Sequence, residues 1–344
     1  MKSSSLPFDR LLAALGTSGA GHAVFSRRGV PLLLLPKDKA IALATVGLYR
    51  PQSAKAKIAA AAVRLLCRLG LHGTLLPKVP GDSDETGVLI CNPCHGTRII
   101  AVRMMADGRL EILKAALPQD AEPIRLEQAA LKRLSGRPGV PKAGLLVERV
   151  GAVWFTMPYL RDAARDVDPV PLLKSWETEE TVPAKENGLI RDLMPLLDER
   201  TRAELSGRTV RRALVHGDFA PWNWRLESDG DHETHEAYET TGSRLVCIDW
   251  EWAREDGFAG FDLVYSLVQQ ALLVSHIPKH HIVSFIRKHI AKQSLASESL
   301  ISNSGLSTDI LVNLVFAYRR MRGMESEPPN TRSTQNPYTM RSSQ

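Results

Sequence analysis

The sequence lacks the features of a membrane-spanning chain and of a small secreted scaffold. No apolar run approaches the roughly 18 to 20 residues of a transmembrane helix, and the densest run, residues 31–36, is far shorter. Four cysteines in 344 residues are too few for a disulfide framework. Asp9 and Arg10 precede any apolar stretch that could form a signal core, so we expect no secretory signal and a cytoplasmic protein.

Two of the cysteines, Cys91 and Cys94, form a CxxC pair, a spacing found in metal and redox sites. No second pair and no CxxH follows nearby. We therefore favour two thiols in a turn, with a metal or redox site as the alternative.

Positive charge is concentrated in the first 80 residues. They contain twelve Lys and Arg against two acids, Asp9 and Asp38, for a net charge of +10, whereas the whole chain carries +6. A helix is predicted over residues 53–69, with Ser53 as its N-cap and Gly70 just beyond its end. Its spacing places Ile58, Ala62, Leu65, Leu66 and Leu69 on one face and Lys57, Arg64 and Arg68 on another.

Such a region could bind an anionic lipid surface or a nucleic acid. The helix has no Trp or Phe to anchor it in lipid, and no aromatic residues are interleaved with its cations for base stacking. We therefore expect no specific nucleic-acid binding. We favour a helix packed on the neighbouring domain with its basic face outward, and keep an anionic surface contact as the alternative.

The composition divides the chain into four segments. Residues 1–80 are a basic extension, in which residues 22–49 predict short strands and turns before the helix. After a polar break at residues 81–85, the chain to residue 157 predicts a small sheet with one helix. Residues 158–324 are mainly helical, and residues 325–344 are polar and contain proline, which predicts a disordered tail.

The small sheet is the clearest structural prediction. Asp107-Gly108 is a strong two-residue hairpin signal between two apolar runs. The predicted strands cover residues 88–91, 99–105, 110–116, 145–150 and 153–157, and the predicted helix covers residues 123–134.

Two short apolar strands in the second half end in polar side chains. Residues 213–216 lead into His216-Gly217-Asp218, with Asn223 five residues beyond the aspartate. Residues 245–248 lead into Asp249. The very polar stretch between these motifs, residues 228–243, is interpreted as a hairpin insertion.

Phosphoryl transfer explains this pattern. The reaction needs an acceptor hydroxyl oriented toward the γ-phosphate and Mg²⁺ to neutralise the phosphate oxygens. Asp218, at a strand-to-loop junction, can accept the hydroxyl proton. Asn223 and Asp249 offer the oxygen ligands that Mg²⁺ prefers.

These motifs resemble the aminoglycoside phosphotransferase and choline kinase family, which is related in fold to protein kinases. His216–Asn223 matches its His-Gly-Asp-x-x-x-x-Asn pattern, Asp249-Trp250-Glu251 matches its metal-binding segment, and residues 257–263 resemble its Gly-x-x-x-x-Asp-Leu stretch. The resemblance covers residues 87 to about 270. It implies an α+β bilobal fold, with a small β-rich N-terminal lobe carrying one helix and a larger, mostly helical C-terminal lobe.

The resemblance also implies roles for single residues, with ATP and Mg²⁺ as cofactors. Asp218 would be the catalytic base, and Asn223 and Asp249 the Mg²⁺ ligands. His216 would hold the loop, and Asp262 would tie the metal-binding loop to a helix.

A kinase-like site also needs a strand lysine that contacts the phosphates and a helix glutamate that holds it. Lys114 lies among apolar residues on the predicted strand 110–116. Because burial of an unpaired ammonium is costly, we expect a carboxylate partner. Glu127 on the following helix is the first candidate, and Glu122 is the alternative.

The resemblance places a phosphate-covering turn at residues 92–98 and the interlobe hinge at residues 156–160. The turn has one glycine, so Thr97 or Arg98 could contact phosphate directly. In the hinge, Met157 and Tyr159 would bind adenine through their backbone, whereas Pro158 has no N–H to donate.

The sequence therefore predicts a small-molecule kinase that moves the γ-phosphate of ATP onto a hydroxyl. The acceptor stays open among sugars, amino alcohols, amino acids and aminoglycosides. Glu177, Glu179 and Glu180 would suit a cationic acceptor, and Trp176, Trp222, Trp224 and Trp252 could form an aromatic box for a choline-like one. A kinase-like protein that binds nucleotide without transferring phosphate is the alternative.

Overall fold

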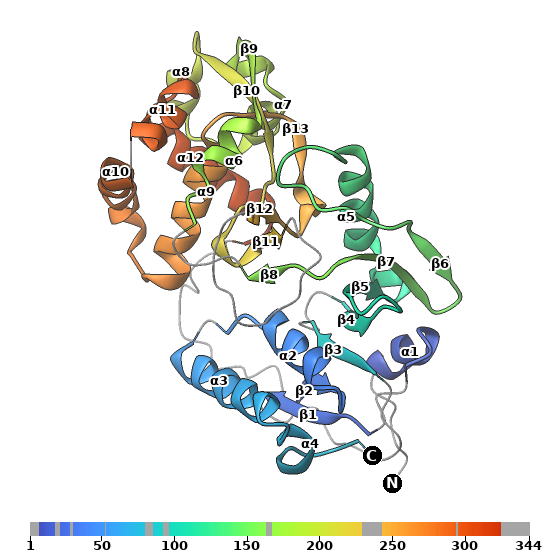
Figure 1. The fold of residues 1–344 in the computed structure, drawn as a ribbon. Helices are drawn as coiled ribbons and strands as arrows, with labels where there is room; N and C mark the ends of the chain where they lie inside the picture. The colour runs from blue at the N-terminus through green and yellow to red at the C-terminus, as the bar shows by residue number, and fades with distance from the viewer. Residues whose placement is uncertain are drawn as a thin grey trace, which may run out of the picture.

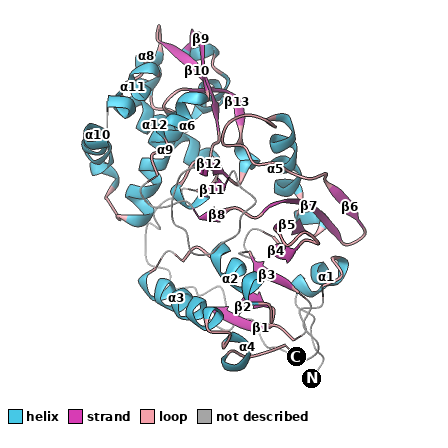
Figure 2. Ribbon diagram, viewed as in Figure 1, coloured by secondary structure: helices cyan, strands magenta, loops and turns pink. Residues whose placement is uncertain are grey.

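The chain folds into two lobes, which Figures 1 and 2 show as a β-rich N-terminal part and a larger, mainly helical C-terminal part. The computed structural model describes residues 7–17, 21–27, 30–51, 53–79, 85–91, 96–162, 167–228, 243–293 and 295–324. The predicted α+β architecture, with a small N-terminal sheet lobe before a helical lobe, is confirmed. The predicted disordered tail at residues 325–344 lies outside the described residues.

The N-terminal lobe is built on one antiparallel sheet with the strand order β1-β2-β3-β4-β5-β7-β6. Its strands are β1 (Ala23–Arg27), β2 (Val30–Leu35), β3 (Thr86–Ile90), β4 (Arg98–Met104), β5 (Leu110–Ala116), β6 (Val147–Arg149) and β7 (Ala152–Pro158). The five strands predicted between residues 88 and 157 correspond to β3 to β7. Gly108, at the predicted hairpin, has a φ of +83°, which glycine adopts without strain.

Residues before and after the polar break at 81–85 contribute to the same sheet. Leu33 of β2 pairs with Leu89 of β3, so the basic extension supplies two strands and does not form a separate unit. The break therefore does not coincide with a boundary in the fold. Of the break itself, residues 81–84 lie outside the described part of the chain.

Helix α2 (Lys39–Leu48) corrects the prediction of only strands and turns over residues 22–49. Its apolar run is buried against both the sheet and another helix, so it shows no clear helical period. Asp38 caps it, because its carboxylate accepts the amide hydrogen of Ile41 at 2.8 Å.

The two faces of the sheet are covered by different helices. Antiparallel partners share a face, so Lys114 of β5 projects on the same side as Ile100 and Phe155. Helices α2 and α5 (Glu122–Arg133) pack on this side. Helix α1 (Pro7–Ala14) packs on the opposite face.

Helix α3 (Ala54–Arg68) begins and ends as predicted, with the Ser53 hydroxyl accepting the Ala56 amide hydrogen and Gly70 at a φ of +72°. The face that packs is not the predicted one. Ala60, Val63 and Cys67 are buried against α2 and the sheet, whereas the predicted apolar face points outward. The short helix α4 (His72–Leu75) follows.

The C-terminal lobe contains two small sheets, with strand orders β13-β10-β9 and β12-β11-β8, among helices. Strands β11 and β12 pair as a hairpin across residues 229–242, which lie outside the described part. The strands are β8 (Arg161–Asp162), β9 (Glu177–Pro183), β10 (Thr209–Val215), β11 (Trp224–Ser228), β12 (Ser243–Cys247) and β13 (Arg254–Phe258). The helices are α6 (Val170–Ser175), α7 (Gly188–Leu193), α8 (Glu199–Leu205), α9 (Phe261–Gln269), α10 (Ile282–Gln293), α11 (Leu295–Asn303) and α12 (Thr308–Met321).

Among the described residues, no single helix has both the length and the apolar composition to cross a membrane. One pair, Ser297–Asn303 with Thr308–Met321, meets the criteria of length and composition together but is bent by 78°.

The packing of α2 on β3 can be tested at Gly87. A Cβ at this position would lie 1.8 Å from Oγ1 of Thr45 on α2, so Gly87→Ala should force the helix away from the sheet. We expect a loss of about 1–3 kcal/mol in the free energy of unfolding, measured by urea denaturation. Gly73→Ala, where a Cβ meets no atom within 4 Å, is the control, and equal stability of the two variants would contradict this packing.

Candidate active site

The centre of the site is Lys114, which lies on β5 and is almost fully buried. Its Nζ donates hydrogen bonds to Oε1 and Oε2 of Glu127 at 2.7 and 2.9 Å and also contacts Oδ1 of Asp249. Burial alone would lower the pKa of Lys114, but Asp249 and Glu127 outweigh this effect and hold the pKa above its usual value. The lysine is therefore charged and fixed in position by two carboxylates.

The ion pair predicted between Lys114 and Glu127 is present, and the alternative partner Glu122 is not involved. Glu127 is buried on the inner face of α5, whereas Glu122 lies at the exposed start of this helix, near Arg125. Oε1 of Glu127 also accepts the backbone N–H of Asp249 at 3.0 Å. The glutamate thus joins the sheet of one lobe to a loop of the other.

Asp249 follows β12 and has an unusual backbone for a non-glycine residue, with φ 67° and ψ 57°. The contacts with Lys114 and Glu127 hold the residue in this left-handed conformation. Lys114 lowers the pKa of Asp249 against the opposing effect of burial, so the side chain is ionised. Its side chain is 41% exposed, so the carboxylate remains open to a ligand.

His216 connects the two loops that carry the candidate residues. Its Nδ1 accepts the backbone N–H of Asp218 at 3.1 Å, so Nε2 is the protonated nitrogen and donates to the carbonyl oxygen of Ile248 at 2.9 Å. Burial lowers the pKa of His216 to about 4. The neutral ring is thus a structural link, as the resemblance implied, and one that stays uncharged at neutral pH.

Asp262 holds the loop of the candidate base and not the metal-binding loop, which corrects the sequence-based expectation. From the first turn of α9, its carboxylate accepts the backbone N–H groups of His216 at 2.6 Å and Gly217 at 3.1 Å. Burial raises the pKa of Asp262 to about 7, and these two amides oppose the rise. Gly217 has a φ of +79°, and a Cβ there would lie 2.6 Å from the Trp252 carbonyl oxygen.

Asp218 and Asn223 lie on one loop between β10 and β11. The side-chain N–H of Asn223 donates to the backbone carbonyl oxygen of Asp218 at 2.9 Å, while the backbone carbonyl oxygen of Asn223 accepts the backbone N–H of Ile248 at 3.0 Å. These bonds place Asn223 beside the segment that leads to Asp249. Asp218, Asn223 and Asp249 come from two motifs far apart in the sequence, and the fold brings them to one region.

Two residues that the sequence reasoning missed hold the carboxylate of Asp218. Tyr265 of α9 donates from its hydroxyl to Oδ1 at 2.8 Å, and Arg322, after α12, places Nη1 3.7 Å from the same atom. Burial raises the pKa of Asp218, whereas Arg322 and Tyr265 lower it. The i, i+4 spacing of Tyr318 and Arg322 is the one available signal, since it places the arginine, at the C-terminal cap of α12, in line with the buried face of this helix.

The side chains fit a magnesium site. Asp249 and Asn223 supply carboxylate and amide oxygens, which are hard ligands, and Asp249 is ionised. No cluster of three or more His, Cys, Asp or Glu side chains suited to a metal occurs in the described part of the chain. Two protein ligands suit Mg²⁺, which keeps several waters and commonly completes its shell with substrate phosphates.

The hinge is covered by α2. Met157 is buried, and the backbone N–H of Tyr159 already donates to the Leu110 carbonyl oxygen at 3.1 Å. The Tyr159 hydroxyl donates to the Ala44 carbonyl oxygen of α2 at 3.4 Å. Adenine binding through Met157 and Tyr159 therefore stays a prediction, because the amide of Tyr159 is engaged within the sheet.

Two arginines lie beside this hinge. Burial, reinforced by the charge of nearby Arg225, lowers the pKa of Arg50 at the end of α2 to about 9. Arg225 follows Asn223 by two residues and is also buried, with Nη1 donating to the Trp222 and Trp224 carbonyl oxygens at 2.7 and 2.8 Å. The hinge side of the site is thus positively charged, while the Lys114 side carries two carboxylates.

The predicted phosphate-covering turn lies partly outside the described residues, at 92–95. In the part that the structure describes, the Thr97 N–H donates to Oδ2 of Asp120 at 2.8 Å. Nη1 of Arg98 lies 3.9 Å from Oε2 of Glu251. Of the CxxC pair, Cys94 is in the undescribed part. Burial raises the pKa of Cys91 to about 11, so this thiol is protonated at neutral pH.

The features considered for acceptor binding do not gather into one pocket. Glu179 and Glu180 lie exposed on β9 near Arg211 and Arg212, and Glu177 accepts a hydrogen bond from Asn303. Trp176 and Trp224 are buried and pack on Phe219. Trp252 lies apart from them, with the Arg322 guanidinium 4.2 Å from its ring centre.

Comparison with known proteins finds likeness at the level of structure alone. No family model and no curated protein matches the sequence. A thermostable mutant of aminoglycoside phosphotransferase APH(4)-Ia matches with a TM-score of 0.37 and 11% identity, over 66% of this chain and 85% of that one. An ethanolamine kinase of Plasmodium vivax matches with a TM-score of 0.36 and 12% identity, over 85% and 89%. At TM-scores below 0.5, these likenesses do not decide the chemistry, which rests on the side chains described above.

The role of Glu127 can be measured against Glu122 on the same helix. Glu127→Gln removes a buried carboxylate that receives three hydrogen bonds, so we expect a loss of about 2 kcal/mol in the free energy of unfolding. Glu122→Gln, at an exposed position, should change it by less than about 0.5 kcal/mol. Chemical denaturation of both variants tests this, and equal effects would contradict the buried ion pair.

Proposed function

We propose that this chain is an ATP-dependent, Mg²⁺-requiring phosphotransferase that acts on a hydroxyl of a small molecule. The observation that carries the proposal is the Lys114–Glu127–Asp249 cluster, with Asp218 on the adjacent loop. A buried cation, a ligand-ready carboxylate and a proton acceptor are the parts that phosphoryl transfer requires.

In this proposal each residue has one task. Lys114 binds the α- and β-phosphates, and Glu127 orients it. Asp218 orients the acceptor hydroxyl and receives its proton. Asp249 and Asn223 would hold Mg²⁺, which neutralises charge on the phosphate oxygens when bound.

The second candidate is a nucleotide-binding protein that does not transfer phosphate. It is favoured by α2, which packs on the Lys114 side of the sheet, and by Tyr159, whose amide is engaged within the lobe. Binding of ATP without any turnover across a library of hydroxyl compounds would support this candidate.

The role of Asp218 distinguishes the two candidates. Asp218→Asn should lower turnover by roughly 10²- to 10⁴-fold, because no carboxylate then receives the proton of the substrate hydroxyl. ATP affinity, measured by calorimetry, should remain within a few-fold of the wild type. ATP consumption with a metabolite library gives the rate, and Asp107→Asn, on an exposed turn, is the control. Unchanged turnover in Asp218→Asn would reject the assignment.

Arg322 gives an independent test of the same site. Its Nη1 donates to the Gly217 carbonyl oxygen at 2.8 Å, next to Asp218. In the proposed reaction the guanidinium would stabilise the negative charge of the phosphoryl group as it moves to the acceptor hydroxyl. Arg322→Met should lower kcat at least roughly tenfold with a smaller change in the KM for ATP. Arg320→Met, in the last turn of α12 with an exposed side chain bonded to the Leu196 carbonyl oxygen, should retain wild-type kcat. Equal kcat values for the two variants would exclude Arg322 from the site.

A further inference from the structure

Helix α3 presents an apolar stripe to solvent. Ile58, Leu65 and Leu69 are 71%, 55% and 60% exposed. With the exposed Ala61 and Ala62 they occupy positions i, i+3, i+4, i+7 and i+11, which form one continuous face of a helix. We call these five residues the α3 stripe. Leu71 and Leu75, just beyond the helix, are also exposed and extend the apolar surface.

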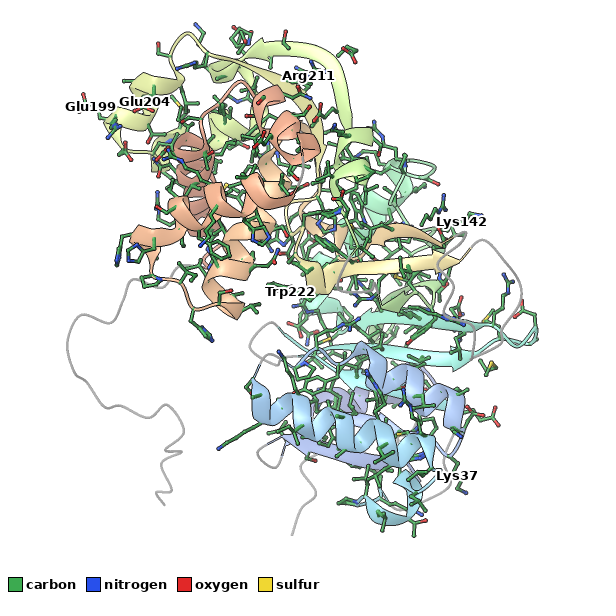
Figure 3. The ribbon with its side chains drawn as sticks, turned by 60° about the vertical axis from the view of Figure 1, so that its left-hand side comes forward. Lys37, Lys142, Glu199, Glu204, Arg211 and Trp222 are labelled. Atoms are coloured by element: carbon green, nitrogen blue, oxygen red, sulfur yellow. The ribbon has the colours of Figure 1, made fainter. Side chains whose placement is uncertain are left out.

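The helix is already anchored without this stripe. Ala60, Val63 and Cys67 are buried in the cluster that joins α3 to α2 and to β2. The three large side chains of the stripe therefore lie outside the buried cluster that holds the helix on the lobe. Figure 1 shows α3 at the edge of the N-terminal lobe, and in Figure 3 it crosses the front of that lobe with no described element over it.

Cations flank the stripe on both sides. Lys57 and Arg68 follow one edge and Lys55 the other, and all three are exposed. From residue 39 to residue 79 the sequence contains seven Lys or Arg and no Asp or Glu. An exposed apolar stripe with cations at its edges matches a surface that offers both anionic groups and an apolar interior.

We propose that the α3 stripe docks this protein on the surface of an anionic phospholipid bilayer. The helix lies in the plane of the interface, its apolar side chains enter the boundary of the acyl chains, and its cations contact the lipid headgroups. A nucleic acid would use the cations but leave the apolar side chains in water. An anionic bilayer satisfies both parts of the surface.

Vesicle co-sedimentation of the full chain tests the proposal. Binding should be stronger to phosphatidylcholine vesicles containing phosphatidylserine than to phosphatidylcholine alone, and weaker at high salt. Ile58→Gln, Leu65→Gln and Leu69→Gln together should weaken binding by roughly tenfold or more. Lys57→Gln and Arg68→Gln should weaken it by roughly fivefold for each cation removed.

Matched controls separate the stripe from general exposure and charge. Leu145 and Val150 are 78% and 102% exposed on the same lobe, so Leu145→Gln with Val150→Gln should bind vesicles like the wild type. Arg109→Gln, which removes an exposed cation elsewhere in the lobe, should have little effect. Circular dichroism checks that all variants are folded.

Three outcomes would overturn the proposal. The first is equal binding to neutral and anionic vesicles, or equal binding by the stripe variant and the wild type. The second is binding to duplex DNA that depends on Lys57 and Arg68 but not on the stripe. The third is a dimer, without lipid, that the stripe variant disperses. Vesicle binding is measured without nucleotide, so Asp218→Asn should bind vesicles like the wild type. Failure of the docking proposal therefore leaves the phosphotransferase proposal unaffected, and the reverse also holds.

Discussion

The buried contact of Lys114 with Glu127 and Asp249 is the interaction on which the arrangement of the two lobes depends. A cation this far from water requires partners, and the chain supplies one from α5 and one from the loop after β12. Glu127 also binds the backbone of Asp249, which keeps that residue in a left-handed conformation. A single charged cluster thus fixes the sheet, its helix and the opposite lobe relative to one another.

A second layer of contacts sets the loop of the candidate base. The neutral ring of His216 joins the Asp218 backbone to Ile248, and Asp262 binds two successive amides of the same loop. Tyr265 and Arg322 then hold the carboxylate itself. All of these groups are largely shielded from water, so their hydrogen bonds restrict the carboxylate strongly. These contacts fix the position of the Asp218 carboxylate through groups of the chain itself.

The first 80 residues belong to the N-terminal lobe more closely than their composition indicated. Their two strands extend the sheet, and α2 packs on the side from which Lys114 projects. This leaves α3 on the outside with its apolar stripe exposed. The basic character of the segment and its exposed apolar surface therefore occur on one helix, which is the physical basis for the proposed docking on an anionic surface.

The sequence by itself determined the strand ends that deliver Asp218, Asn223 and Asp249, the hairpin at Gly108 and the need of Lys114 for a carboxylate partner on the following helix, whereas the choice of Glu127 over Glu122 came from the structure. These follow from local signals, namely apolar runs, turn residues and the cost of burying one charge. Only the tertiary structure decided which face of α3 packs, that α2 is a helix on the site side of the sheet, and that Arg322 reaches the base. These depend on which surfaces meet across long sequence separations, and a buried helix without polar positions leaves no periodic signal in its sequence.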